Sequence, residues 1–288
     1  MLRSFVFSLS LLCLLAIAAM TTNCGSSSKS NNGGGGTGGG PYDVVGDWQI
    51  TVSGNGGSTT GYGVINSSGL ALFFDSLGES LELPTITGAS SFSGTITVTE
   101  PGGLSSSASA QGNVSSATSL SGTVSGNGSG TFSASSYSPV TSVKALSGPM
   151  LGESEGISIL AELTFTSSGS NSSMSFTGTS GITCLVSGTF TQEGGTVSTL
   201  NVFDVSMTFS GTNCPTPTTS AITGLGFESS SDYFGFNFSN PATYLYADML
   251  DPAGAFPIEI YPQAVGAASP STHALSPERR GPPWSQIF

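Results

Sequence analysis

Apolar and polar residues alternate along most of the chain after residue 41. Trp48, Ile50 and Val52 are separated by polar residues, and similar alternation recurs in short segments up to about residue 260. A two-residue period is that of a β-strand with one buried face, and no window keeps the 3.6-residue apolar repeat of a helix. Leu70–Phe74 is a continuous apolar run, which predicts a strand that is covered on both faces. The chain is therefore predicted to be all-β.

The alternation comes in two blocks, 41–140 and 145–265, with a stretch lacking it between them. Each block offers about eight short strands, the spacing expected of an antiparallel sandwich or a small barrel. In the first block, Asn55-Gly56 and Asn127-Gly128 predict hairpin turns, because both turn positions favour positive φ. We expect two β domains, and the alternative is that both blocks merge into one larger sheet.

A four-residue phrase recurs at irregular spacing. It reads FSGT, LSGT, FTGT, VSGT and FSGT, and it begins at Phe92, Leu120, Phe176, Val186 and Phe209. Glycine within a strand weakens it and often marks a bulge or a bend. We interpret the phrase as an inward apolar residue followed by glycine at a bend or bulge of a hairpin.

The first residues have the organisation of an export signal. Arg3 provides a positive charge, and Phe5–Ala19 is an apolar run interrupted only by serine. A membrane-spanning helix needs about 20 apolar residues, so this run has the proportions of a secretory signal instead. Ala16-Ile17-Ala18 provides a cleavage pattern that would release a soluble chain after Ala18.

Cys24 closely follows the apolar run and opens a polar, glycine-rich segment, 24–40. This arrangement resembles bacterial lipoprotein precursors, and the resemblance covers the first forty residues. It implies a signal peptide over 1–23, lipid on Cys24, and attachment to the cell envelope, with a bacterial outer membrane as the expected location. Because Gly/Ser-rich chain behaves as flexible coil, 24–40 would then be a tether. The alternative is a soluble secreted protein with a leftover cysteine.

Composition excludes some partners. Only 8% of the 288 residues are charged, the formal net charge is −12, and the sequence pI is near 4.1. After the tether the only basic residues are Lys144, Arg279 and Arg280. Nucleic-acid binding depends on Lys and Arg that neutralise phosphates, so we expect none. An electrostatic hold on anionic lipid is excluded for the same reason.

Cys184 and Cys214 are the cysteines of the second block. In an oxidising compartment such a pair predicts a disulfide. The only histidine, His273, lies in the segment 266–288, which has prolines at intervals and no alternation and is expected to be a disordered tail. A metal site and a Cys–His catalytic pair therefore lack ligands or partners, and we predict no metal and no cofactor.

A second candidate site is a group of aromatic residues late in the second block. Exposed tyrosines there could stack on sugars or line an apolar pocket. The alternative, which we favour, is the hydrophobic core of the second domain, because alternating Phe is typical of a buried strand face. The residues are Tyr233, Phe234, Phe236, Phe238, Tyr244 and Tyr246.

Acidic residues form two loose groups. Paired carboxylates at a suitable separation could hydrolyse glycosides. They could also bind Ca²⁺, but the regular Asp/Asn spacing of calcium-binding loops is missing. We interpret most of these acids as solvated turn residues. The two groups are Asp75, Glu79 and Glu82, and Glu153, Glu155 and Glu162.

Gly46 and Trp48 open the first predicted strand. They resemble the Gly-x-Trp of lipocalin-type barrels, where the tryptophan closes one end of an eight-stranded barrel. That resemblance implies a carrier of a small apolar ligand. The alternative is that Trp48 is simply a core residue.

The sequence contains no H-E-x-x-H and no phosphate-binding loop. We therefore expect a non-enzymatic, lipid-anchored envelope protein with a binding or surface structural role. Its expected partners are the membrane, through lipid on Cys24, and a protein, a glycan or a small apolar ligand. The alternatives are a lipocalin-like carrier and a secreted carbohydrate-active protein. A membrane-spanning barrel is disfavoured, because the strands are too short and too rich in Gly and Ser for a continuous apolar band.

Overall fold

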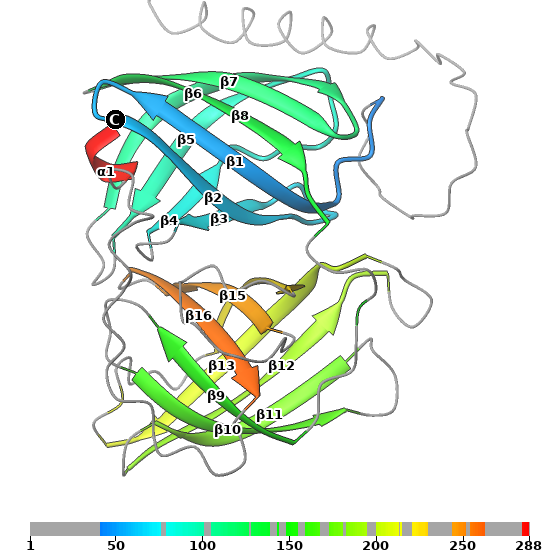
Figure 1. The fold of residues 1–288 in the computed structure, drawn as a ribbon, viewed down its shortest axis with the longest axis vertical. Helices are drawn as coiled ribbons and strands as arrows, with labels where there is room; N and C mark the ends of the chain where they lie inside the picture. The colour runs from blue at the N-terminus through cyan, green and yellow to red at the C-terminus, as the bar shows by residue number, and fades with distance from the viewer. Residues whose placement is uncertain are drawn as a thin grey trace, which may run out of the picture. The chain divides into compact units, whose positions relative to one another are not determined.

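In the computed structural model the chain forms two closed antiparallel β-barrels of eight strands each (Figure 1). In both barrels each strand pairs with the next one along the chain, and the last strand pairs with the first. The structure describes residues 41–75, 79–100, 105–126, 128–138, 143, 148–154, 159–167, 173–180, 183–194, 200–212, 214, 221–229, 244–251, 254–262 and 284–287.

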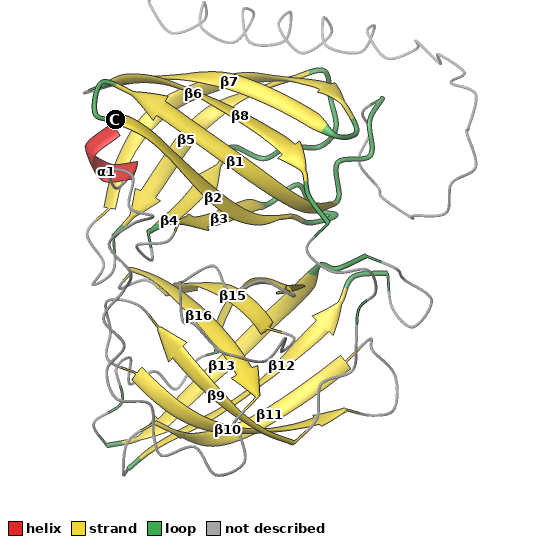
Figure 2. Ribbon diagram, viewed as in Figure 1, coloured by secondary structure: helices red, strands yellow, loops and turns green. Residues whose placement is uncertain are grey.

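Strands dominate the described residues (Figure 2). The first barrel consists of β1 (Gly46–Gly54), β2 (Gly57–Ile65), β3 (Ala71–Asp75), β4 (Ser80–Leu83), β5 (Ser91–Thr99), β6 (Ser105–Ser116), β7 (Ser119–Ser125) and β8 (Ser129–Ser136). The second consists of β9 (Gly148–Ser154), β10 (Ile159–Ser167), β11 (Ser173–Ser180), β12 (Cys184–Gln192), β13 (Phe203–Gly211), β14 (Ile222–Ser229), β15 (Tyr244–Asp251) and β16 (Gly254–Pro262). One short helix, α1 (Trp284–Ile287), is also described.

The all-β prediction is confirmed, as are two units of eight strands. Each sheet closes on itself, so the units are small barrels rather than sandwiches, and they do not merge into one sheet. The strands of the two barrels fall inside the predicted blocks, 41–140 and 145–265. Closure removes the exposed edges that an open sheet would offer for aggregation.

Alternation places the core of the first barrel as predicted. Trp48, Ile50 and Val52 are buried, while the residues between them on β1 are partly exposed. Every residue of β3 is buried, which confirms a strand covered on both faces. Asn55 and Gly56 join β1 to β2 as a two-residue hairpin loop, with Gly54 opposite Gly57.

The interpretation of the recurring phrase needs correction. Gly94, Gly122, Gly178 and Gly188 lie inside β5, β7, β11 and β12 and pair regularly with the neighbouring strands. By strand alternation each lies on the same face of its strand as the apolar residue two positions before it. Only Gly211 ends its strand, with a φ of 114°. Most of these glycines therefore make room for neighbouring side chains rather than forming a bend or a bulge.

The predicted disulfide is confirmed. Cys184 begins β12, Cys214 follows β13, and their sulfur atoms are 2.11 Å apart. Both cysteines are buried in one cluster with Phe176, Val186 and Phe209. The bridge therefore ties the chain after β13 to the inner face of the second barrel.

Residues 284–287 contradict the predicted disordered tail. Trp284 is fully buried in the core of the first barrel, and Ser285 is half-buried. Burying an indole ring removes a large apolar area from water, which stabilises this local fold. The rest of 266–288 lies outside the described residues. No helix among the described residues is long and apolar enough to cross a membrane.

Candidate functional site

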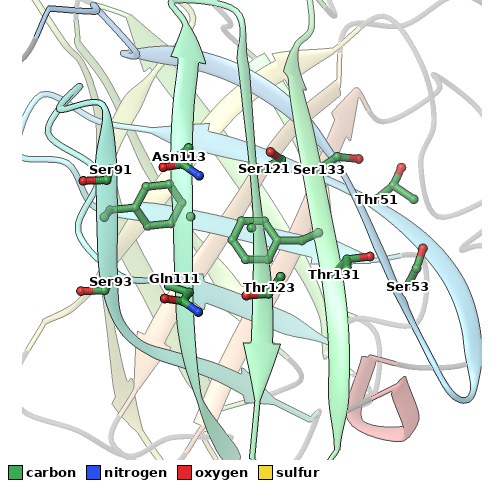
Figure 3. A pocket seen from close by; sticks show the side chains of 14 residues that line it. Thr51, Ser53, Ser91, Ser93, Gln111, Asn113, Ser121, Thr123, Thr131 and Ser133 are labelled. Carbon is green, nitrogen blue, oxygen red and sulfur yellow. The ribbon is translucent and has the colours of Figure 1, made fainter.

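A hollow of about 920 Å³ opens on the first barrel, over strands β1, β8, β7, β6 and β5. Figure 3 shows its side chains in two rows that run across these strands. We call this set the hydroxyl–amide face. It consists of Thr51, Ser53, Ser91, Ser93, Gln111, Asn113, Ser121, Thr123, Thr131 and Ser133.

Strand register produces the two rows. Directly paired positions place Ser53, Thr131, Thr123, Gln111 and Ser93 side by side. The second row lies two residues along each strand, where the same pairing joins Thr51, Ser133, Ser121, Asn113 and Ser91. Neighbouring strands lie about 4.8 Å apart, so five strands give each row a length of about 19 Å.

Between the two rows runs a third one, whose residues face the barrel interior. Phe92 lies opposite Gly112, Gly112 opposite Gly122, and Gly122 opposite Phe132. A β-carbon at Gly112 would lie 2.4 Å from the Phe92 ring, and one at Gly122 would lie 2.3 Å from the Phe132 ring. The two rings are 6.1 Å apart and so lie against the inner side of the sheet beneath the hollow. This packing holds the floor of the hollow in one shape.

The face carries hydrogen-bonding groups and no charge. Eight of its ten residues are Ser or Thr, and the other two are Gln111 and Asn113. A hydroxyl or an amide side chain both donates and accepts hydrogen bonds. Thr51 and Ser53 bond to the hydroxyls of Thr60 and Ser58 on β2. The structure gives none of the other eight side chains a hydrogen bond to a described residue, and all eight are exposed.

The residues predicted as sites lie elsewhere. Cys24, Tyr233, Phe234, Phe236 and Phe238 fall outside the described residues, so the lipidation site and this part of the aromatic group stay predictions. Tyr244 and Tyr246 belong to β15, where they pair with Ser229 and Phe227 of β14. The structure describes their backbone and not their side chains.

The acids of the first group are not solvated turn residues. Asp75 and Glu79 are buried, and the amide of Glu79 donates to Asp75 Oδ1 at 3.0 Å. Glu82 lies on β4 and is half-buried. The bond joins Glu79 to the last residue of β3, and none of the three acids borders the hollow.

In the second group, Glu153 on β9 pairs with Leu160 and Glu259, and Glu162 on β10 pairs with Leu151 and Thr179. Glu155 lies outside the described residues. Among those residues, no cluster of three or more His, Cys, Asp or Glu has the geometry of a metal site.

Trp48 is buried in the core of the first barrel. Its side chain is 1% exposed, and its indole N–H donates to the carbonyl of Val44 at 2.9 Å. The surrounding barrel is an eight-stranded meander, the arrangement that lipocalins also have. Its interior is filled by one apolar cluster that includes Trp284.

Buried polar groups form a separate site around Asn201. The Asn201 amide donates to Asp47 Oδ1 at 3.2 Å and to the carbonyl of Glu228 at 2.8 Å, and it accepts the Glu228 amide N–H at 2.8 Å. Burial raises the pKa of Asp47 to about 8, and the charge of Glu228 adds to this, while the bond from Asn201 opposes it. The Asn201 side chain thus uses both of its N–H groups and its oxygen in bonds to Asp47 and Glu228, which is a structural role.

Glu193 makes a similar contact. Its carboxylate accepts the Ser67 backbone N–H at 2.9 Å and the Ser67 hydroxyl at 3.0 Å. The pKa of Glu193 is raised, chiefly by burial; the bonds from Ser67 oppose this rise, and the charge of Asp204 adds to it.

The ring of Phe74 stacks on the ring of Phe227, with the ring centroids 5.7 Å apart, so β3 and β14 also meet through apolar groups.

No protein-family model, curated protein or solved structure matches the chain.

Sequence reasoning missed the hydroxyl–amide face. A signal was available in the sequence: every second residue of each strand points outward, and on β5–β8 all of these residues are Ser, Thr, Asn or Gln. Alternation identifies these positions as outward, but only the strand register shows that they line up into two rows.

Proposed function

We propose that this chain is an exported envelope protein that binds a neutral, polyhydroxylated ligand, a glycan chain, on the hydroxyl–amide face. Lipid on Cys24 would hold it to the membrane, and no chemical step would follow binding. The observation that supports the proposal is the double row of ten uncharged hydrogen-bonding side chains bordering one hollow.

The spacing of the face matches an extended sugar chain. Adjacent strands are about 4.8 Å apart, comparable to the length of one pyranose unit in a linear glycan. A chain that lies across the strands would place one sugar unit over each strand, with one side chain from each row beside it. Sugar hydroxyls both donate and accept hydrogen bonds, as do the side chains of the face.

The face lacks the groups that catalysis would require. A glycoside hydrolase uses two carboxyl groups that flank the scissile bond. The side chains bordering the hollow include no carboxylate, histidine or cysteine. Binding without turnover is therefore the activity that these residues support.

Ser121 and Ser125 provide a matched test. Both are exposed serines on β7, but only Ser121 borders the hollow. Affinity of the full chain for immobilised neutral polysaccharides (cellulose, starch, xylan) would be compared for Ser121→Glu and Ser125→Glu. We expect at least a tenfold loss for Ser121→Glu and less than a twofold change for Ser125→Glu, because the longer, charged side chain would be desolvated beneath the sugar. Equal affinities of the two variants would contradict the proposal.

The anchor needs a separate measurement. The intact mass of the mature chain from the native membrane fraction should show a diacylglyceryl and an acyl group on Cys24. An unmodified chain that begins at Ala19 would instead support a soluble secreted protein. Ligand binding by the hydroxyl–amide face is decided separately, by the comparison of Ser121→Glu with Ser125→Glu.

A further inference from the structure

Helix α1 places a residue from the C-terminal region inside the first barrel. Trp284 is 0% exposed and belongs to the same apolar cluster as Trp48 and Ile50. Figure 1 shows α1 beside the strands of this barrel. Pairing of the strands β1–β8 closes the barrel without a contribution from this helix. The helix lies more than two hundred residues after β1 in the sequence.

Gly61 provides the space for the indole ring. A β-carbon at position 61 would lie 2.4 Å from Trp284 Cζ2 and 2.5 Å from Cη2. The ring therefore lies directly against the backbone of β2, where any larger residue would exclude it. The indole N–H is buried and has no hydrogen-bond partner among the residues that the structure describes. A core side chain selected only for stability would normally have this donor satisfied.

Glu79 holds the residue next to the ring. Its Oε1 accepts the Ser285 hydroxyl at 2.6 Å, and its Oε2 accepts the Ser285 backbone N–H at 3.1 Å. Glu79 is 3% exposed, so its carboxylate is buried and both of its oxygens are bonded to donors from α1. A buried carboxylate that loses its donors is costly, so this position requires a partner with N–H or O–H groups.

A second hollow adjoins α1. Its volume is about 270 Å³, and its lining includes Ile96, Val98, Ala108 and Ser285. Ile96 and Val98 are also members of the barrel core. Ser285 of α1 therefore borders both this hollow and the buried Glu79 carboxylate, while Trp284 lies against Gly61.

We propose that α1 is a built-in occupant of a ligand site in the first barrel. The site consists of the backbone at Gly61, the wall formed by Ile96 and Val98, and the Glu79 carboxylate. Its external ligand is a flat apolar ring of about the size of indole that carries an adjacent N–H or O–H donor. Trp284 and Ser285 imitate these two parts of the ligand, and the ligand displaces them when it binds.

Tryptamine is the probe, because it joins an indole ring to an ammonium group. Binding would be measured by calorimetry to the full chain and to a chain that ends at Pro283. We expect at least tenfold tighter binding to the shortened chain, because no internal occupant competes. Indole-3-propionate, which has a carboxylate in place of the ammonium, should not bind beside Glu79. Equal affinity of tryptamine for both chains would overturn the proposal.

Two acids of the same region give matched variants. In the shortened chain, Glu79→Gln should weaken tryptamine binding about tenfold, because the charged acceptor is lost. Glu82→Gln, on β4 and half-buried, should change it less than twofold. An equal effect of both variants would show that Glu79 is not the acceptor and would overturn the site as described.

The intact chain gives a measurement that does not depend on the shortened chain folding. The chain has two tryptophans, Trp48 and Trp284, so 5-fluorotryptophan labelling gives two fluorine resonances. Saturating tryptamine should move the Trp284 resonance to the value of an exposed ring and leave the Trp48 resonance unchanged. A Trp284 resonance that stays at its buried value at saturation would identify α1 as a permanent core element and overturn the proposal.

Discussion

Gly122 of β7 lies directly opposite Phe132 of β8, and the Phe132 ring occupies the space that a β-carbon at position 122 would need. Gly112 and Phe92 repeat this relationship on β6 and β5, and Gly188 and Phe176 repeat it in the second barrel. An aromatic ring that covers a cross-strand glycine compensates for the glycine's missing side chain. Glycine in these strands is therefore one half of a packing pair.

This pairing predicts the effect of filling position 122. Gly122→Ala would bring a β-carbon within 2.3 Å of the Phe132 ring and 2.5 Å of the Gln111 carbonyl. Overpacking of this kind costs about 1–3 kcal/mol. Urea unfolding should show this loss in the free energy of unfolding. Gly126→Ala is the control, because its β-carbon would approach only Ala108, at 3.2 Å. The same loss in both variants would mean that the Phe132 contact is not responsible.

The disulfide should stabilise the second barrel. Cys184 and Cys214 are 30 residues apart, and closing a loop of this length contributes about 3–4 kcal/mol in the chain-entropy model. Urea unfolding with and without reductant should differ by this amount. The double variant Cys184→Ala, Cys214→Ala should be insensitive to reductant. An unmodified chain that is equally stable in both conditions would contradict the prediction.

Asp47 predicts a pH dependence of stability. Its folded-state pKa is raised to about 8, chiefly by burial, whereas an unfolded aspartate titrates near pH 4. The folded chain therefore binds more protons between these values, and its stability should fall as the pH rises from about 4 to about 8. One such group changes the free energy of unfolding by at most about 1.4 kcal/mol per pH unit.

The variant Asp47→Asn should lose this part of the pH dependence, because asparagine does not titrate and its side-chain oxygen still accepts the bond from Asn201. Thermal unfolding at several pH values would measure the change. Asp43→Asn, at an exposed position, is the control and should retain the slope. A slope that survives unchanged in Asp47→Asn would assign it to another group.

The local parts of the fold could be predicted from the sequence. Alternation at Trp48, Ile50 and Val52 gave the first strand, Asn55-Gly56 gave its hairpin, and two cysteines gave the disulfide. These signals depend on residues close in sequence or on the redox compartment. Closure into a barrel depends on pairing between β1 and β8, which local patterns do not encode.

The candidate sites could not be predicted because they join distant segments. Thr51 and Ser133 are neighbours on the hydroxyl–amide face only through the pairing of β1 with β8. Ser285 reaches Glu79 across 206 positions of sequence. The tail around Trp284 lacks alternation, so its burial left no periodic signal. Cys24 and the aromatic group at 233–238 remain predictions.

The most direct test of the proposed function is a nuclear magnetic resonance titration of the full chain with neutral oligosaccharides (cellohexaose, maltohexaose and xylohexaose). With at least one of them, saturable shifts of the backbone amides should concentrate on the ten residues of the hydroxyl–amide face. Thr123→Val, which removes one hydroxyl and keeps the shape of the side chain, should weaken that titration about threefold to tenfold. Thr95→Val, at an exposed position of β5 outside the hollow, should not. Saturable shifts that lie elsewhere, or no saturable shift with any of the three sugars, would contradict a glycan-binding face.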